Sequence, residues 1–94
     1  MNKYETVFLV TNTINDEERK DVLEKIKKLI SINGTITSTE ELGEKKLAYE
    51  VREHEKAFYY VIKFESESSF IAELERVYRI TDEIIKFIVV REED

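Results

Sequence analysis

Cysteine, proline and tryptophan are absent from the 94-residue sequence, which also has only two glycines and one histidine. Without cysteine there is neither a disulfide framework nor a thiolate metal site, as expected for a reducing cytosol. No apolar run approaches the roughly 18 residues that a membrane helix needs, and the N-terminus lacks the pattern of a signal peptide. We therefore expect a cytoplasmic protein that folds as one domain over residues 1–94 and has no membrane partner.

Positive charge is in deficit, because 15 lysine and arginine residues stand against 21 aspartate and glutamate residues, for a formal net charge of −6. Proteins that bind nucleic acid on their own usually carry a basic surface, so this charge argues against autonomous binding. A negative chain is better suited to a basic protein partner, unless the charge serves only solubility.

Hydrophobic periodicity predicts six elements in the order β-α-β-β-α-β. The strands are expected over residues 4–11, 35–52, 57–64 and 84–90. The first helix is expected to be capped at Asn15 or Asp16 and to end at Asn33-Gly34. The residues that recur in it at helical spacing are Val22, Leu23, Ile26, Leu29 and Ile30. The second presents an apolar face formed by Phe70, Ile71, Leu74, Val77 and Tyr78. This order predicts an α+β, ferredoxin-like sandwich, in which a four-stranded antiparallel sheet carries both helices on one face and its first and third strands are central.

The segment Leu42–Tyr49 separates two alternating apolar patterns that are out of phase with each other. Apolar residues before it occupy even positions such as Ile36, and those after it occupy the odd positions of Leu47, Tyr49 and Val51. Because strand side chains alternate between faces, a single apolar face survives this change only if one extra residue is inserted. Gly43 is the expected place for that β-bulge, since glycine tolerates a positive φ. The sequence thus predicts a long strand, bent near Gly43, that displays Lys45 and Lys46.

Residues suited to catalysis are few. His54, the single histidine, is flanked by charged residues and is interpreted as a solvated loop residue. The carboxylates often occur as adjacent pairs, which point to opposite sides of a strand and seldom share a proton. Small acylphosphatases have the same topology but need an anion-binding loop with arginine after the first strand, and residues 12–16 contain none. We therefore expect no enzyme, no cofactor, no metal and no small-molecule substrate.

Several short motifs, spread over the whole chain, match those of one protein family. They are Tyr4-Glu5, Asn33-Gly34, Leu42-Gly43-Glu44-Lys45-Lys46-Leu47-Ala48-Tyr49, Leu74-Glu75-Arg76, Tyr78-Arg79-Ile80 and Ile88-Val89-Val90-Arg91. The Leu-Gly-x-basic-basic-Leu-Ala-Tyr run is the most specific of them. Together the motifs resemble those of the bacterial small-subunit ribosomal protein six family, with their spacing preserved from end to end.

This resemblance implies a structural, rRNA-binding constituent of the small ribosomal subunit. Members of that family bind the central domain of the small-subunit ribosomal RNA as a heterodimer with the eighteenth small-subunit ribosomal protein, which is small and basic. Carried over to this sequence, the implied RNA-binding residues are Lys3, Lys45, Lys46, Lys86 and Arg91, with Arg79 as a weaker candidate. Asn2 stands where relatives often have a basic residue, and Glu44 adds a negative charge to the Leu-Gly motif. The chain alone is therefore expected to bind RNA weakly.

Two other functions stay open at this point. RNA-recognition modules of the same topology stack bases on aromatic residues of the first and third strands. Candidates for that role are Tyr4, Phe8, Tyr59 and Tyr60, although the third strand lacks the usual glycine-aromatic motif of such modules. The remaining alternative is a ligand-binding or dimerisation domain of the same topology, acting through the sheet or one of its edges.

Overall fold

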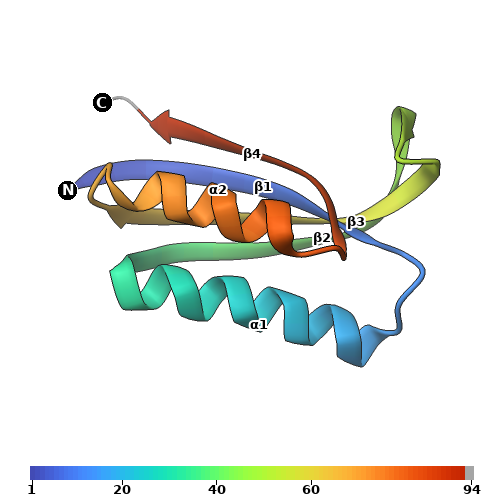
Figure 1. Cartoon of the computed structure of the whole chain (residues 1–94), viewed down its shortest axis with the longest axis horizontal. Coiled ribbons are helices and arrows are strands. Elements are labelled where there is room, and N and C mark those ends of the chain that lie inside the picture. Colours follow the sequence, from blue (N-terminus) through green and yellow to red (C-terminus); the bar gives the residue numbers. More distant parts are fainter. Residues whose placement is uncertain (93–94) are drawn as a thin grey trace.

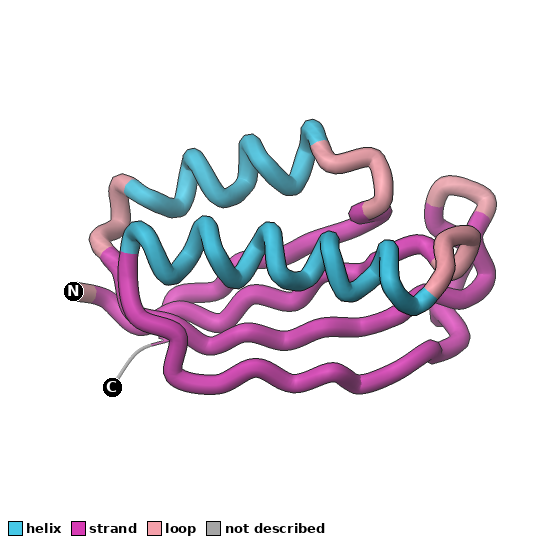
Figure 2. The backbone as a smooth tube through the Cα atoms, turned by 90° about the horizontal axis from the view of Figure 1, so that it is seen from below, coloured by secondary structure: helices cyan, strands magenta, loops and turns pink. Residues whose placement is uncertain are grey.

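The computed structural model describes residues 1–92, and the acidic residues 93 and 94 lie outside the described part. Its elements are β1 (Asn2–Thr11), α1 (Asp16–Asn33), β2 (Gly34–Val51), β3 (His54–Ser66), α2 (Phe70–Ile80) and β4 (Ile84–Glu92). The strands form one antiparallel sheet in the order β2-β3-β1-β4, and both helices cover the same face of it (Figure 1, Figure 2). This arrangement confirms the predicted ferredoxin-like sandwich, with β1 and β3 at the centre of the sheet.

The main core lies between the sheet and the two helices. Every second residue of β1 from Tyr4 to Val10 points into it, opposite Phe58, Tyr60, Ile62 and Phe64 of β3. The helices contribute the residues that their periodicity predicted: Val22, Leu23, Ile26 and Ile30 from α1, and Phe70, Leu74, Val77 and Tyr78 from α2. The spacing of apolar residues therefore identified correctly which side of each helix is buried.

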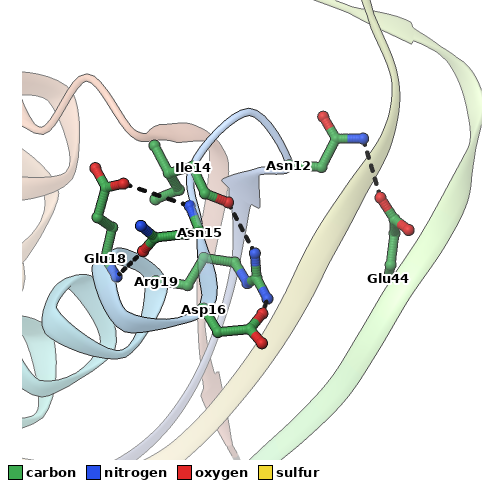
Figure 3. A network of polar contacts seen from close by, with 7 residues as sticks. All are labelled: Asn12, Ile14, Asn15, Asp16, Glu18, Arg19 and Glu44. Atoms are coloured by element: carbon green, nitrogen blue, oxygen red, sulfur yellow. Dashed lines mark hydrogen bonds and ion pairs between the residues drawn. The ribbon is translucent and has the colours of Figure 1, made fainter.

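Helix α1 begins at the predicted cap. The Asn15 side chain accepts a hydrogen bond of 2.8 Å from the backbone N–H of Glu18, whose carboxylate in turn accepts one from the Asn15 N–H (Figure 3). This reciprocal pair satisfies two of the N–H groups that a helix start leaves without partners. Arg19 reaches back to the Ile14 carbonyl oxygen at 2.9 Å and to the Asp16 carboxylate, which fixes the β1–α1 loop against the first turn.

The end of α1 differs from the usual glycine cap. Gly34 has φ −173°, which is extended backbone, and it is already the first residue of β2. The helix carbonyl of Leu29 is bonded instead by the Asn33 side chain, at 2.9 Å. Glycine is required at position 34 for space, because a Cβ there would overlap the backbone carbonyl oxygen of Glu65 in β3.

Strand β2 contains the predicted bulge and a second one. Glu41 lies opposite Tyr60 and Gly43 opposite Tyr59, so Leu42 is the inserted residue, and Gly43 has a φ of 79°. A further insertion at Thr37, which no glycine marks, precedes it. The prediction of a single apolar face is wrong, however, because Ile36 packs in the main core whereas Leu47 packs on the opposite side of the sheet.

The β2–β3 hairpin closes through a strained two-residue turn. Val51 pairs with His54, and the intervening Arg52 and Glu53 have φ values of 48° and 65°. Turns with two positive φ angles favour Asn-Gly, because most other side chains are strained there.

We expect Glu53→Gly to raise the free energy of unfolding by about 0.5–1 kcal/mol, measured by chemical denaturation. Glu55→Gly, just inside β3, should instead lower it, and a loss of stability in Glu53→Gly would contradict this reading of the turn.

Candidate nucleic-acid interface

The sheet face that is not covered by helices, here called the open face, carries a small apolar cluster of its own. Leu9, Leu47, Ala57 and Ile85 are buried there, with Tyr59 partly buried beside them. Between Lys46 and Val51 the residues of β2 leave the regular pairing with β3, so that Leu47 packs on Leu9 and Ile85. The result is a groove of about 240 Å³, whose lining includes Val7, Tyr49, Lys86 and Ile88.

Lys86 lies at the rim of this groove and contacts the hairpin. Its ammonium donates a hydrogen bond of 3.3 Å to the Tyr49 hydroxyl oxygen and lies 5.3 Å from the centre of the Tyr49 ring. The Tyr49 side chain is itself 67% exposed. This contact joins the two edge strands, β2 and β4, across the open face, although β1 and β3 lie between them in the sheet.

Lys45 and Lys46 are both exposed but lie on opposite sides of β2. Lys45 is opposite Ala57, which belongs to the open face, and Lys46 is opposite Lys56. Residues directly opposite in a ladder share a face, so Lys46 lies on the side that the helices cover elsewhere in the sheet. Within residues 1–92, neither lysine side chain forms an ion pair or a hydrogen bond. The motif therefore presents one cation on each side of an edge strand.

The other predicted cations divide into two groups at opposite ends of the sheet. Lys86 and Arg79 lie towards the hairpin end, where the Arg79 guanidinium is 3.9 Å from the Glu75 carboxylate and 6.0 Å from the Phe87 ring. Lys3 and Arg91 lie at the end with the termini (Figure 1). Lys3 is opposite Glu65 and Glu92, and Arg91 donates a hydrogen bond of 2.9 Å to the Asn2 side-chain oxygen. The six residues thus do not form one continuous patch.

The base-stacking alternative is contradicted for three of its four aromatic residues. Tyr4, Phe8 and Tyr60 point into the main core and are at most 5% exposed, with Tyr4 stacked on Phe64 and Phe8 on Tyr60. Only Tyr59 lies on the open face. One partly buried tyrosine does not provide the pair of stacking platforms on which such modules rely.

His54 is not the solvated loop residue that the sequence suggested. It is the first residue of β3, partly buried, and its Nδ1 lies 2.9 Å from the Arg52 carbonyl oxygen. A carbonyl only accepts, so Nδ1 carries a proton, and Nε2 forms a second hydrogen bond, of 2.9 Å, with the Thr11 hydroxyl. Thr13 also bonds to Thr11. His54 therefore links the hairpin to the end of β1 and has a structural explanation.

The fold and these surfaces define a class of protein: a ferredoxin-like domain with exposed cations at both ends of its sheet. In the described part of the chain no group of residues is arranged to hold a metal ion, and no helix is long and apolar enough to cross a membrane. The surface features described above are exposed lysines on the hairpin and an apolar groove, both of which are suited to binding another molecule.

Comparison with known proteins identifies the family. The family described as "Ribosomal protein S6" matches residues 3–91. The small ribosomal subunit protein bS6 of Nitratiruptor sp. is 45% identical over 94 residues, covering 99% of this chain and 73% of that protein. The protein of the same name from Caldanaerobacter subterraneus subsp. tengcongensis is 39% identical over the full length of both chains. The longer bS6 of Helicobacter acinonychis, 41% identical, is covered over 65% of its length.

A solved structure agrees with the sequence comparisons. The crystal structure of 30S ribosomal protein S6 from Thermotoga maritima matches with a TM-score of 0.93 at 34% identity, over 97% of this chain and 87% of that one. The chain therefore belongs to the ribosomal protein S6 family, whose members are non-enzymatic, structural proteins of the small ribosomal subunit. Family membership confirms the resemblance found in the sequence and the expectation that the chain is not an enzyme.

Proposed function

We propose that this chain is a structural constituent of the small ribosomal subunit and binds the central domain of small-subunit ribosomal RNA together with the basic eighteenth small-subunit protein. Membership of the ribosomal protein S6 family supports the first part. The observation that supports the second part, RNA binding with a basic partner, is the set of three exposed cations at the hairpin end of the sheet: Lys45, Lys46 and Lys86. None of them is neutralised by an ion pair with residues 1–92.

The net charge explains why a partner is needed. Each phosphate contact adds roughly one unit to the slope of log affinity against log salt, so a few lysines support only modest affinity. The remainder of this chain is acidic and repels phosphate at longer range. A basic partner bound beside the lysines supplies the missing positive charge. We therefore expect weak RNA binding by the free chain and cooperative binding by the two proteins together.

Charge reversal tests the two sides of the Leu-Gly motif separately. Lys45→Glu changes the open face and Lys46→Glu the opposite side, so each variant reports on one surface. If both lysines contact RNA, each variant should weaken the complex of RNA and both proteins by roughly tenfold and flatten its salt dependence. Filter binding or fluorescence anisotropy over a salt series measures both quantities.

The matched control is Lys28→Glu, an exposed lysine on α1 that lacks any ion pair within residues 1–92. It makes the same change in net charge far from the hairpin, so it should leave the slope unchanged. Equal effects of all three variants would show that only net charge matters. Tight binding of ribosomal RNA by the free chain at physiological salt would contradict the need for a partner.

A further inference from the structure

The structure places Lys46 of β2 directly opposite Lys56 of β3. Their pairing is the last regular one before the four residues of β2 that leave the ladder, and both lysines are exposed. Directly opposite residues in an antiparallel ladder have Cβ atoms about 4.5–5.5 Å apart and share a face, and two like charges at this spacing are destabilising. Two lysines thus lie directly opposite each other in a protein that has 21 acidic residues and a net charge of −6.

The neighbours of this lysine pair on the same face are already engaged. Glu44, two residues before Lys46, accepts a hydrogen bond of 2.9 Å from the Asn12 side chain (Figure 3). Phe58, two residues after Lys56, is covered by the Arg19 guanidinium at 3.6 Å. His54, on the other side of Lys56, is bonded to Thr11. No side chain from this face therefore compensates the two charges.

Other carboxylates lie near but do not neutralise the pair. Glu50, Glu53 and Glu55 line the same surface hollow as Lys56. Within residues 1–92, none of them approaches a lysine within ion-pair distance, and the Lys56 side chain forms no hydrogen bond. The two lysines are thus exposed to solvent where the regular pairing of β2 with β3 ends.

From this arrangement we propose that Lys46 and Lys56 together clamp one phosphate group of the ribosomal RNA backbone. This proposal rests on the proposed RNA-binding function and adds Lys56, a residue that the sequence analysis did not select. A lysine ammonium binds phosphate as a point charge, and two of them at cross-strand spacing bring donors to separate oxygens of one phosphate. The bound phosphate removes the repulsion that the free protein carries.

The clamp makes two predictions of opposite sign for Lys56→Gln. The melting temperature of the free chain should rise by roughly 1–4 °C, because the like-charge pair is removed. The salt slope of the complex with a central-domain transcript and the basic partner should fall by roughly one unit, with weaker binding at physiological salt. A lysine that serves only the fold would not combine these two effects. Thermal unfolding and a salt series of binding measurements give the two readouts.

Additional variants distinguish two lysines that bind one shared phosphate from two lysines that bind separate phosphates. If Lys46 and Lys56 hold one phosphate, Lys46→Gln and Lys56→Gln will not be additive, and the double variant will bind nearly as well as either single one. Lys28→Gln, on α1, should leave both the melting temperature and the slope unchanged. Wild-type binding with an unchanged slope in Lys56→Gln would overturn the clamp, and failure of the wild type to bind would instead refute the proposed function. Weaker binding of the partner protein in the absence of RNA would assign Lys56 to a protein carboxylate and also overturn the clamp.

Discussion

Replacing Gly34 with alanine should lower the free energy of unfolding by about 2–3 kcal/mol, although alanine has the higher intrinsic preference for ordered structure. The cause is backbone contact. A Cβ at position 34 would overlap the Glu65 carbonyl oxygen and would lie 3.0 Å from the Ser66 Cβ. Gly34 follows the last residue of α1 directly, so the start of β2 cannot move away from β3 without moving the helix. Thermal unfolding should show a loss of roughly 10 °C or more.

Gly43→Ala is the matched comparison for this prediction. No atom lies within 4 Å of a Cβ built at Gly43, so the only cost there is the φ of 79°. That conformation costs an L-residue roughly 1–2 kcal/mol, which is partly offset by the smaller backbone entropy of alanine in the unfolded chain. Gly34→Ala should therefore be the more damaging of the two. The reverse order of stabilities would show that β2 shifts readily at its start.

Local patterns in the sequence predicted the helices and strands better than they predicted which side of each strand packs against the helices. The bounds of α1 follow from Asn15 and Asn33, whose side chains make local hydrogen bonds that any isolated helix end would favour. For β1 and β3 the central position was predictable because both faces are apolar. Because both faces are apolar, the pattern does not indicate which face the helices cover, so Tyr4 and Tyr60 stayed open as candidates for base stacking although they are core residues.

The register of β2 against β3 could not be predicted from the sequence, because it depends on contacts between residues far apart in the chain. Gly43 marks one bulge of β2 by its conformational freedom, whereas the bulge at Thr37 has no such residue and depends on pairing with β3. Each inserted residue exchanges the two faces for everything that follows. The juxtaposition of Lys46 with Lys56 depends on both bulges and on the hairpin turn, so no pattern of neighbouring residues indicates it.

A second large effect is expected at the buried contact between Thr6 and Tyr78. The two hydroxyl oxygens are 2.8 Å apart, and Thr6 also donates to the Ile88 carbonyl oxygen at 2.9 Å, so the Tyr78 hydroxyl is the donor to Thr6. Thr6→Val removes the acceptor and leaves the Tyr78 hydroxyl buried without a partner, which should cost about 2–3 kcal/mol. The double variant Thr6→Val/Tyr78→Phe should recover part of this loss, and a loss equal to the sum of the single variants would contradict the pairing.

The same tyrosine should make the protein sensitive to alkali. Burial raises the pKa of Tyr78 well above its ordinary value, and the hydrogen bond to Thr6 offsets only part of that rise. Above about pH 10 the unfolded chain releases the phenolic proton while the folded chain retains it, so the free energy of unfolding falls by about 1.4 kcal/mol per pH unit for this one group. Burial also raises the pKa of Tyr60, and the contribution of Tyr60 to the alkaline slope remains when Tyr78 is replaced. Tyr78→Phe should remove its own share of the alkaline slope in denaturant titrations from pH 8 to 11. Equal slopes in the wild type and Tyr78→Phe would show that the Tyr78 hydroxyl reaches solvent before the chain unfolds.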